Sequence, residues 1–389
     1  MYNRSLWALS IYQLLSNNRS SLFTVYFVLF VVQNDHASVA GGLASFSAAN
    51  VAGSLISPLA GRLSDRMNTR RSLLLIAEAS SLPFFVAIPF VGNFLDVSFL
   101  FLIAETLLSV GQTALQAFIA DITPADERGR GYGFVNAVGS AGAIAGTLLS
   151  GVIAQFFGLA SIFYLVGFLG VGTIALVLTT VPNHELPKSE HRTKRLKEMK
   201  GVLVFSVWTS IRTLGTGAVL AYLGTYASVL RANNFEVSLV ATARLVTAAV
   251  AGTWLGHLVD RFGEIRAYIL GTAVVVLSMI MYILANNWTV LIPAGIIYSG
   301  GFYLLSPAML SWVTKIAPEN RKAEYLGAFS MINSTFWSFG PVPGAITQEL
   351  YGNFGLFSYA LVTTLISLFS VYVVYERKMK HQVAETGTG

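Results

Sequence analysis

The stretch GRLSDRMNTRR, residues 61–71, recurs in altered form as GHLVDRFGEIR at residues 256–266, a shift of 195. Two further pairs show a shift of 194: ITPADERGRGYG from Ile122 matches IAPENRKAEYLG from Ile316, and GTLLSG from Gly146 matches GPVPGA from Gly340. Three matches at nearly one spacing indicate an internal duplication. The chain is therefore predicted to consist of two similar halves in a parallel arrangement, which is typical of a transporter architecture.

The composition places both halves in a membrane. Of 389 residues, 54% are hydrophobic and 11% are charged, whereas a soluble globular protein is about 25% charged. The 35 glycines are expected where membrane helices pack closely. Because there is no Cys, disulfides and thiolate metal sites are excluded. A polytopic membrane protein without metal or cofactor is therefore expected.

A membrane helix needs about 20 apolar residues, and the chain contains twelve candidates. These spans are 6–33, 38–61, 71–93, 97–120, 131–157, 160–182, 201–229, 237–258, 266–286, 289–313, 325–350 and 354–376. The predicted fold class is all-α, with twelve transmembrane helices. We expect an N-terminal half (1–182), a basic cytoplasmic linker (183–200), a C-terminal half (201–378) and a tail (379–389).

The distribution of Lys and Arg predicts the orientation, because cytoplasmic loops are enriched in both residues. The loops after the second, fourth, sixth, eighth and tenth spans are basic, as is the C-terminal end, while the opposite loops contain one basic residue, Arg231. Both termini are therefore expected to be cytoplasmic, in a multi-pass protein of the plasma membrane. This asymmetry accounts for the net charge of +6, so no nucleic-acid partner is expected.

The chain resembles members of the major facilitator superfamily over essentially its whole length. The family signature after the second helix is G-x-L-x-D-R-x-G-[RK]-[RK], and the stretch from Gly61 to Arg71 follows it except at Asn68 and Thr69. The resemblance implies that the motif closes the cytoplasmic side during transport; an ordinary loop salt bridge, worth under about 1 kcal/mol, is the simpler alternative. The candidate gate residues are Gly61, Asp65, Arg66, Arg70, Arg128, Asp260 and Arg261.

Two departures separate the chain from the drug exporters of that family. Their G-P-x-x-G-G pattern on the fifth helix is represented by Gly146, Thr147, Ser150 and Gly151, without the Pro. Leu107 also stands where those exporters have an Arg on the fourth helix. Both departures weaken the interpretation as a drug exporter.

The segment LLSNNRSSLF, residues 14–23, carries Arg19 in the middle of an apolar run. A hinge at this point would leave a piece of about 12 residues, which is too short to span a bilayer, so one continuous helix is predicted. Arg212 lies 193 residues later, deep in the seventh span. Two like charges on repeat-related helices predict an anion between them, because Arg binds carboxylate and phosphate through paired hydrogen bonds. This pattern resembles the organophosphate antiporters and organic anion symporters of the family.

Three further charges lie within spans: Arg244, Glu78 and Glu105. Such charges cost at least a few kcal/mol unless they face water or a partner, and they usually mark function. Glu105 begins a polar stripe with Ser109, Gln112 and Gln116 at helical spacing. A carboxyl group there would exchange a proton as an Arg switches between it and a bound anion, so Glu105 and Glu78 are predicted to couple transport to protons. Helix-holding Arg–Glu pairs and a packing stripe are the structural alternatives.

Other polar and aromatic residues at the expected cavity depth are weaker candidates for substrate contact. With the three arginines, the predicted substrate-binding set includes Asn17, Asn18, Asn50, Gln112, Asn136, Trp208, Tyr222, Tyr298, Asn333 and Trp337. The predicted function is alternating-access transport of a small organic anion, carboxylate or phosphorylated, by a proton-coupled monomer. An anion is favoured because three Arg against two Glu leave the predicted cavity with an excess positive charge. The alternative is a proton-driven exporter of drugs or sugars with internal Arg–Glu switch pairs. Nothing in the sequence indicates an enzyme.

Overall fold

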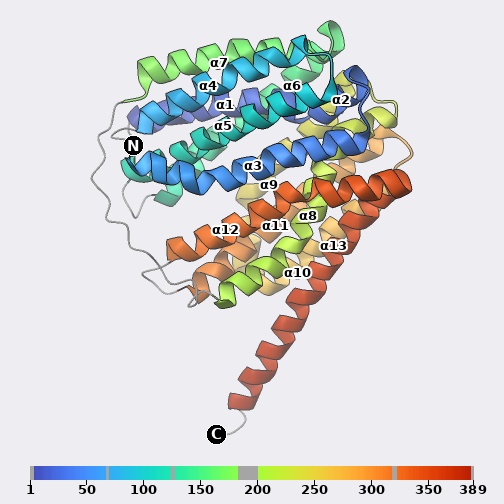
Figure 1. The fold of residues 1–389 in the computed structure, drawn as a ribbon. Coiled ribbons are helices and arrows are strands. Elements are labelled where there is room, and N and C mark those ends of the chain that lie inside the picture. Colours follow the sequence, from blue (N-terminus) through green and yellow to red (C-terminus); the bar gives the residue numbers. More distant parts are fainter. Residues whose placement is uncertain (1–3, 67–69, 124–127, 183–199, 318–321, 387–389) are drawn as a thin grey trace. The chain divides into compact units, whose positions relative to one another are not determined.

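The computed structural model describes residues 4–66, 70–123, 128–182, 200–317 and 322–386. Within these ranges the secondary structure is helical and contains no strand, as Figure 1 shows. The all-α prediction is confirmed. The linker prediction at 183–200 falls almost entirely outside the described residues, as does the last part of the tail at 387–389.

The first predicted span contains two helices, α1 (Arg4–Thr24) and α2 (Phe27–Asn34). The break lies at Val25 and Tyr26, not at the polar triplet. Asn17, Asn18 and Arg19 all lie inside α1, which is continuous through them. The prediction of a helix running through Arg19 is therefore correct. The prediction of one unbroken helix to residue 33 is wrong, because a turn at Val25 and Tyr26 separates α1 from α2.

The next five predicted spans each coincide with a helix. They are α3 (Val39–Arg66), α4 (Arg70–Ala87), α5 (Phe94–Ile122), α6 (Arg128–Phe157) and α7 (Ser161–Thr180), with a short 3-10 turn, η1 (Ile88–Phe90), after α4. Helices α6 and α7 pack against α1, and α5 packs against both α3 and α4. This packing brings α1, α4 and α5 together around the predicted charged residues.

The remaining spans follow the same order with one difference. The helices are α8 (Lys200–Val229), α9 (Asn234–Phe262), α10 (Glu264–Ile283), α11 (Leu291–Ile316), α12 (Lys322–Phe339) and α13 (Pro341–Thr386), with η3 (Trp288–Val290) before α11. The predicted span 325–350 is divided at Gly340, because the following Pro341 has no N–H and begins a new helix. Gly352 interrupts α13 with φ 64°, a backbone conformation that favours glycine.

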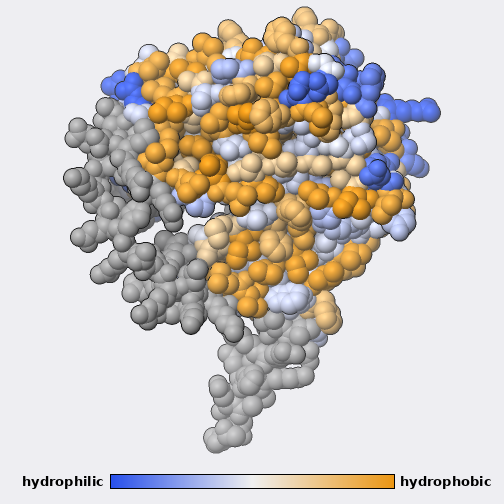
Figure 2. Space-filling model, viewed as in Figure 1, coloured by the Kyte–Doolittle hydropathy of each residue, from blue (hydrophilic) through white to orange (hydrophobic). Residues whose placement is uncertain are grey.

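The described helices are apolar enough to lie in a bilayer. Nine of them, α12 and α13 counted together as one stretch, are long and hydrophobic enough to cross a membrane within the described part of the chain. Many large hydrophobic side chains are exposed, among them Leu95, Phe156 and Phe168, and Figure 2 shows such residues over the visible helix faces. In water these faces would be unfavourable, whereas lipid is as apolar as they are.

The chain divides into two compact units. Unit 1 contains the described residues of Met1–Arg192 together with Ala221–Leu245, and unit 2 contains those of Thr193–Leu220 and Val246–Gly389. The last part of α8, from Ala221, and the first part of α9, to Leu245, therefore belong to unit 1. Specific contacts explain this assignment: the Tyr26 hydroxyl donates to the carbonyl of Asn234, and the Asn234 side chain donates to the Ala154 carbonyl at 3.0 Å.

The internal repeat is visible in how helices pack within each unit. In unit 1, a Cβ on Gly146 of α6 would lie 2.2 Å from the Asn18 carbonyl oxygen of α1. In unit 2, a Cβ on Gly340 would lie 2.0 Å from the Leu214 carbonyl oxygen of α8. Gly146 and Gly340 are the residues that the third repeat pair aligns. Each is small because a helix backbone passes directly against it.

Candidate functional site

Unit 1 contains a buried ion pair between α1 and α4. Nη2 of Arg19 lies 2.6 Å from Oε2 of Glu78, and the two side chains are 0% and 1% exposed. The other Glu78 oxygen, Oε1, accepts a hydrogen bond of 2.8 Å from the Tyr12 hydroxyl. The Arg19 charge is thus neutralised inside the protein, and a tyrosine on the same helix holds its carboxylate partner.

Glu105 of α5 lies close enough to Arg19 for the two charges to interact. Farther along the same stripe, Nε2 of Gln112 donates to the Ser16 hydroxyl of α1 at 3.2 Å. Gly53 of α3 packs directly against the Ser109 side chain. The predicted stripe on α5 therefore faces α1 and α3 rather than lying at the periphery of unit 1, and its carboxylate, Glu105, is within range of the Arg19 charge.

The asparagines before Arg19 are part of the same region. Nε2 of Gln13 donates to Oδ1 of Asn17 at 2.9 Å. Oδ1 of Asn18 is buried and has no hydrogen-bond partner among the described residues. Both side chains are only partly exposed, so they lie within the packed surroundings of α1, where Asn18 retains an unused acceptor.

Arg212 of α8 lies in unit 2 and is 1% exposed. Its guanidinium carbon is 5.7 Å from the centre of the Phe302 ring, and it interacts with the Tyr268 hydroxyl. No carboxylate pairs with it among the described residues, and its Nε and Nη1 atoms have no hydrogen-bond partner there. Unlike Arg19, it is a buried positive charge with only aromatic neighbours identified.

The weaker candidates are distributed over both units. In unit 1, Tyr222 is buried and stacks on Tyr226, Asn50 donates to its own helix, Asn136 is exposed and Arg244 is half-buried. In unit 2, Tyr298 is buried and stacks on Phe302, Asn333 donates to Ser210 at 3.4 Å, Trp208 is exposed and Trp337 is partly buried. In unit 2 the structure links Arg212 and Tyr298 through the Phe302 ring, which both contact.

The predicted gate residues are only partly described. Gly61 is in α3 with open space where a Cβ would lie, and Arg261 is exposed. The side chains of Asp65, Arg66, Arg128 and Asp260 lie outside the described residues. Arg70 forms an ion pair with Asp121, Nε to Oδ2, at 2.9 Å, which joins the beginning of α4 to the end of α5.

The corresponding place in unit 2 holds an ion pair of opposite polarity. Glu264 pairs with Lys315, and both are 194 residues after Arg70 and Asp121 respectively. The Ser311 hydroxyl also donates to Oε1 of Glu264 at 2.9 Å. The repeat therefore preserves this contact between neighbouring helix ends while exchanging which helix carries the acid.

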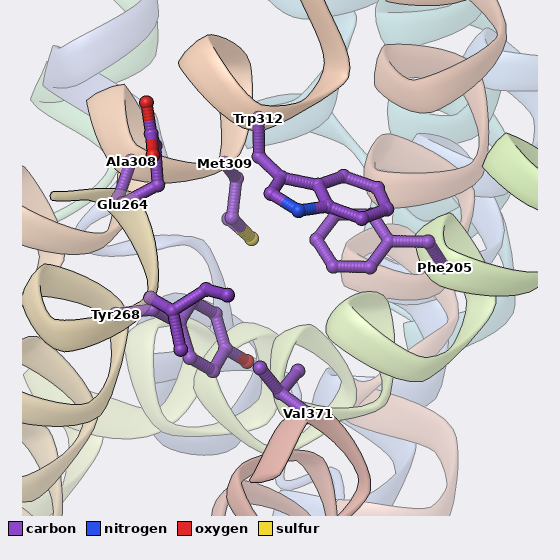
Figure 3. A pocket seen from close by; sticks show the side chains of 8 residues that line it. Phe205, Glu264, Tyr268, Ala308, Met309, Trp312 and Val371 are labelled. Carbon is purple, nitrogen blue, oxygen red and sulfur yellow. The ribbon is translucent and has the colours of Figure 1, made fainter. Parts of the chain in front are cut away.

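A small apolar pocket lies next to this pair, and Figure 3 shows its lining. The Trp312 and Phe205 rings stack at 3.6 Å on one side, and Tyr268 and Met309 face them. The Tyr268 hydroxyl is hydrogen-bonded to Ser367 at 2.6 Å. With its polar groups already paired, this pocket offers little chemistry, and none of its residues was predicted to bind substrate.

The sequence interpretation missed two neighbours of the arginines, Tyr12 and Phe302. Tyr12 precedes Arg19 by seven residues, which places both on one helix face, so the sequence contained a signal for it. Phe302 follows Tyr298 by one turn but comes from a helix distant in sequence from Arg212, so only packing could identify it. Among the described residues, no group of three acidic or His side chains is arranged to hold a metal ion.

Comparison with known proteins agrees with this architecture. A family model described as Major Facilitator Superfamily matches residues 9–235 and 205–388. Multidrug resistance protein MdtG of Enterobacter lignolyticus is 26% identical over 346 residues, which is 84% of this chain and 79% of that protein. An uncharacterized MFS-type transporter of Methanocaldococcus jannaschii is 29% identical over 154 residues, 39% of this chain and 40% of that one.

Solved structures show the same fold. A bacterial homologue of the human lysosomal transporter Spinster, in an inward-facing and occupied conformation, superposes with a TM-score of 0.76 at 14% identity and covers 97% of this chain and 98% of its own. At that identity the likeness concerns the fold. Taken with the match of the family model to both halves, it shows that the chain is a multi-pass membrane protein that belongs to the Major Facilitator Superfamily.

Proposed function

We propose that the chain is a proton-driven exporter of small drug-like compounds, working by alternating access in the plasma membrane with both termini cytoplasmic. The observation that carries the proposal is the buried Arg19–Glu78 ion pair, 2.6 Å long and closed to solvent. It is the internal switch pair that the exporter interpretation requires. In this interpretation Arg19 is part of the coupling machinery rather than a ligand of the substrate.

The chemistry follows from one cation with two carboxylates in reach. Arg19 pairs with Glu78 and is close to Glu105, but one positive charge neutralises only one carboxylate. Because a second buried negative charge is costly, the carboxylate that Arg19 leaves takes up a proton. A change of partner by Arg19 thus moves a proton on or off Glu105 or Glu78, and the Tyr12 hydrogen bond favours Glu78 as the resting partner.

The direction and the substrate class rest on the relatives. MdtG is described as a multidrug resistance protein and aligns with 84% of this chain, and a multidrug efflux pump homologue of Lactococcus lactis is 24% identical over 87% of it. The missing Pro on the fifth helix and Leu107 on the fourth set this chain apart from the common exporter pattern. A different substrate range within the exporters is therefore expected.

The experiment is substrate-driven proton movement in proteoliposomes. Full-length protein is reconstituted around a pH-sensitive dye, and a panel of lipophilic cations, neutral sugars and organic anions is added outside. At least one compound is expected to move protons with the wild type. Glu105→Gln should abolish that movement while leaving substrate exchange between equal concentrations, and Glu349→Gln, which removes an exposed carboxylate of α13, should leave both unchanged.

Two outcomes of this experiment would contradict the proposal. Proton movement that survives in both Glu105→Gln and Glu78→Gln would remove these residues from coupling. Transport by the wild type that proceeds at equal rate with and without a pH difference, and moves no protons, would remove proton coupling altogether.

A further inference from the structure

Arg19 and Arg212 lie on corresponding helices of the two halves, 193 residues apart, which is close to the repeat shift, but they have different electrostatic surroundings. Both are buried, and both leave Nε and Nη1 without a hydrogen-bond partner among the described residues. Only the Arg19 charge is neutralised by an ion pair. The Arg212 guanidinium instead lies over the Phe302 ring at 5.7 Å, in a unit where the described residues place no carboxylate against it.

The repeat shows which group is missing. The ion pairs at the helix ends align Arg70 with Glu264, a shift of 194, and the same shift aligns Glu78 with Thr272. Thr272 is fully buried, and its hydroxyl donates to the Tyr268 carbonyl one turn earlier at 2.7 Å. The position that supplies the counter-charge in unit 1 is thus occupied in unit 2 by a neutral side chain that is already satisfied.

A buried guanidinium without a carboxylate is unfavourable, since an aromatic ring compensates only part of the lost hydration. Arginine never gives up its proton to relieve this cost. An anion supplied from outside the protein would neutralise the charge and would accept hydrogen bonds from guanidinium nitrogens that have no partner among the described residues. The geometry therefore favours an oxyanion ligand at Arg212.

The neighbours of Arg212 describe the rest of that ligand. Phe302 stacks on Tyr298 at 6.2 Å and meets the Tyr303 ring edge-on at 5.5 Å. Phe302 and Tyr303 are partly exposed, so the aromatic cluster next to Arg212 is not closed off completely. Flat aromatic groups pack well against such rings. An aromatic body attached to the anionic group would replace contacts that Phe302 makes with its neighbours.

We propose that Arg212 binds the carboxylate of the transported compound, and that the substrates are small amphipathic anions with an aromatic body. The inference rests on the proposed transport function and names its substrate class. It assigns the two arginines separate tasks: Arg19 exchanges carboxylate partners during proton coupling, and Arg212 selects the substrate by charge.

The test uses matched ligands and a substitution taken from the repeat. Binding of 2-naphthoate, 2-naphthamide and 2-naphthyl phosphate to the purified full-length protein is measured by titration calorimetry. Naphthoate is expected to bind at least tenfold more tightly than the isosteric amide. Thr272→Glu restores the carboxylate that unit 1 has at Glu78, so it should pair with Arg212 and weaken naphthoate at least tenfold. Thr272→Gln, of the same size but uncharged, should change the affinity less than threefold.

Several results would overturn the inference. They are equal binding of the acid and the amide, an unchanged naphthoate affinity in Thr272→Glu, or equal losses in Thr272→Glu and Thr272→Gln. Tighter binding of the phosphate than of the carboxylate would overturn the assignment to carboxylates. Arg212→Gln should remove the preference for the acid; if that variant does not fold, the Thr272 pair decides.

The proposed function fails separately. A wild-type protein that transports its substrate without moving protons, but still binds naphthoate more tightly than the amide, would contradict the exporter mechanism and leave the substrate class standing. Intact proton coupling without a preference for the acid over the amide would contradict the proposed substrate class and leave the exporter mechanism standing.

Discussion

The ends of the helices and their buried middles preserve the internal repeat in different ways. At the ends, Arg70–Asp121 in unit 1 and Glu264–Lys315 in unit 2 occupy equivalent positions with the charges exchanged. In the middle, Arg19 has Glu78 as its partner, whereas Arg212 lies over the Phe302 ring, and the residue 194 positions after Glu78 is the neutral Thr272. Both units thus have an ion pair at the helix ends, whereas in the buried middle both have an arginine but only unit 1 has an ion pair among the described residues.

The difference follows from solvation. Near water an ion pair contributes about 1 kcal/mol or less, and either arrangement of the two signs joins the helix ends equally well. In the membrane interior each charge needs a partner or a task. A substitution that removes the carboxylate there is tolerated only where something else meets the arginine, so the asymmetry between the buried sites carries functional information that the exchange at the ends does not.

The largest expected effect is in the buried middle. Glu78→Gln leaves Arg19 without its carboxylate, and breaking a buried pair from one side costs about 3–5 kcal/mol. The variant should show a strongly lowered melting temperature in detergent. The double variant Arg19→Gln with Glu78→Gln should recover part of the loss, because no guanidinium is then left without its partner and Glu105 can take up a proton. A double variant that is less stable than Glu78→Gln alone would show that the pair's charge is not what matters.

A smaller effect on stability is expected at the helix-end ion pair of unit 1, Arg70–Asp121. Arg70→Glu places two acids opposite each other and, because the Arg70 side chain is only 8% exposed, should destabilise by more than the about 1 kcal/mol of an exposed pair. Adding Asp121→Lys reproduces the polarity of Glu264–Lys315 and should restore the melting temperature to near the wild-type value. Failure of the exchange to restore stability would mean that the polarity of the pair is specified by its surroundings in unit 1.

The smallest effect is expected for Lys315→Ala. The Lys315 side chain is 66% exposed, so its ion pair with Glu264 is largely solvated, and its removal should change stability by about 0.5 kcal/mol or less. The Ser311 hydrogen bond to Glu264 remains in the variant. A melting temperature lowered as much as in Arg70→Glu would show that this pair contributes more than its exposure indicates.

Much of the fold was predictable because membrane residence constrains a sequence strongly. Apolar runs long enough to span a bilayer identify helices with little ambiguity, and the breaks at Gly340 and Gly352 involve residue types that interrupt helices. The break at Val25 and Tyr26 involves two residues that do not normally end a helix. It is associated with the contact of Tyr26 with Asn234, 208 residues away, which no local pattern records.

The candidate site was predictable in its members but not in its pairing. The sequence by itself determined that Arg19, Glu78, Glu105 and Arg212 lie deep within membrane helices, because depth follows from position along a span, and it determined which residues the repeat relates. Only the tertiary structure decided that Arg19 pairs with Glu78 in the presence of Glu105, that Tyr12 holds this carboxylate, and that Arg212 meets Phe302 instead of an acid. Helical periodicity states which face a residue occupies, but which faces of different helices meet depends on how the backbones pack.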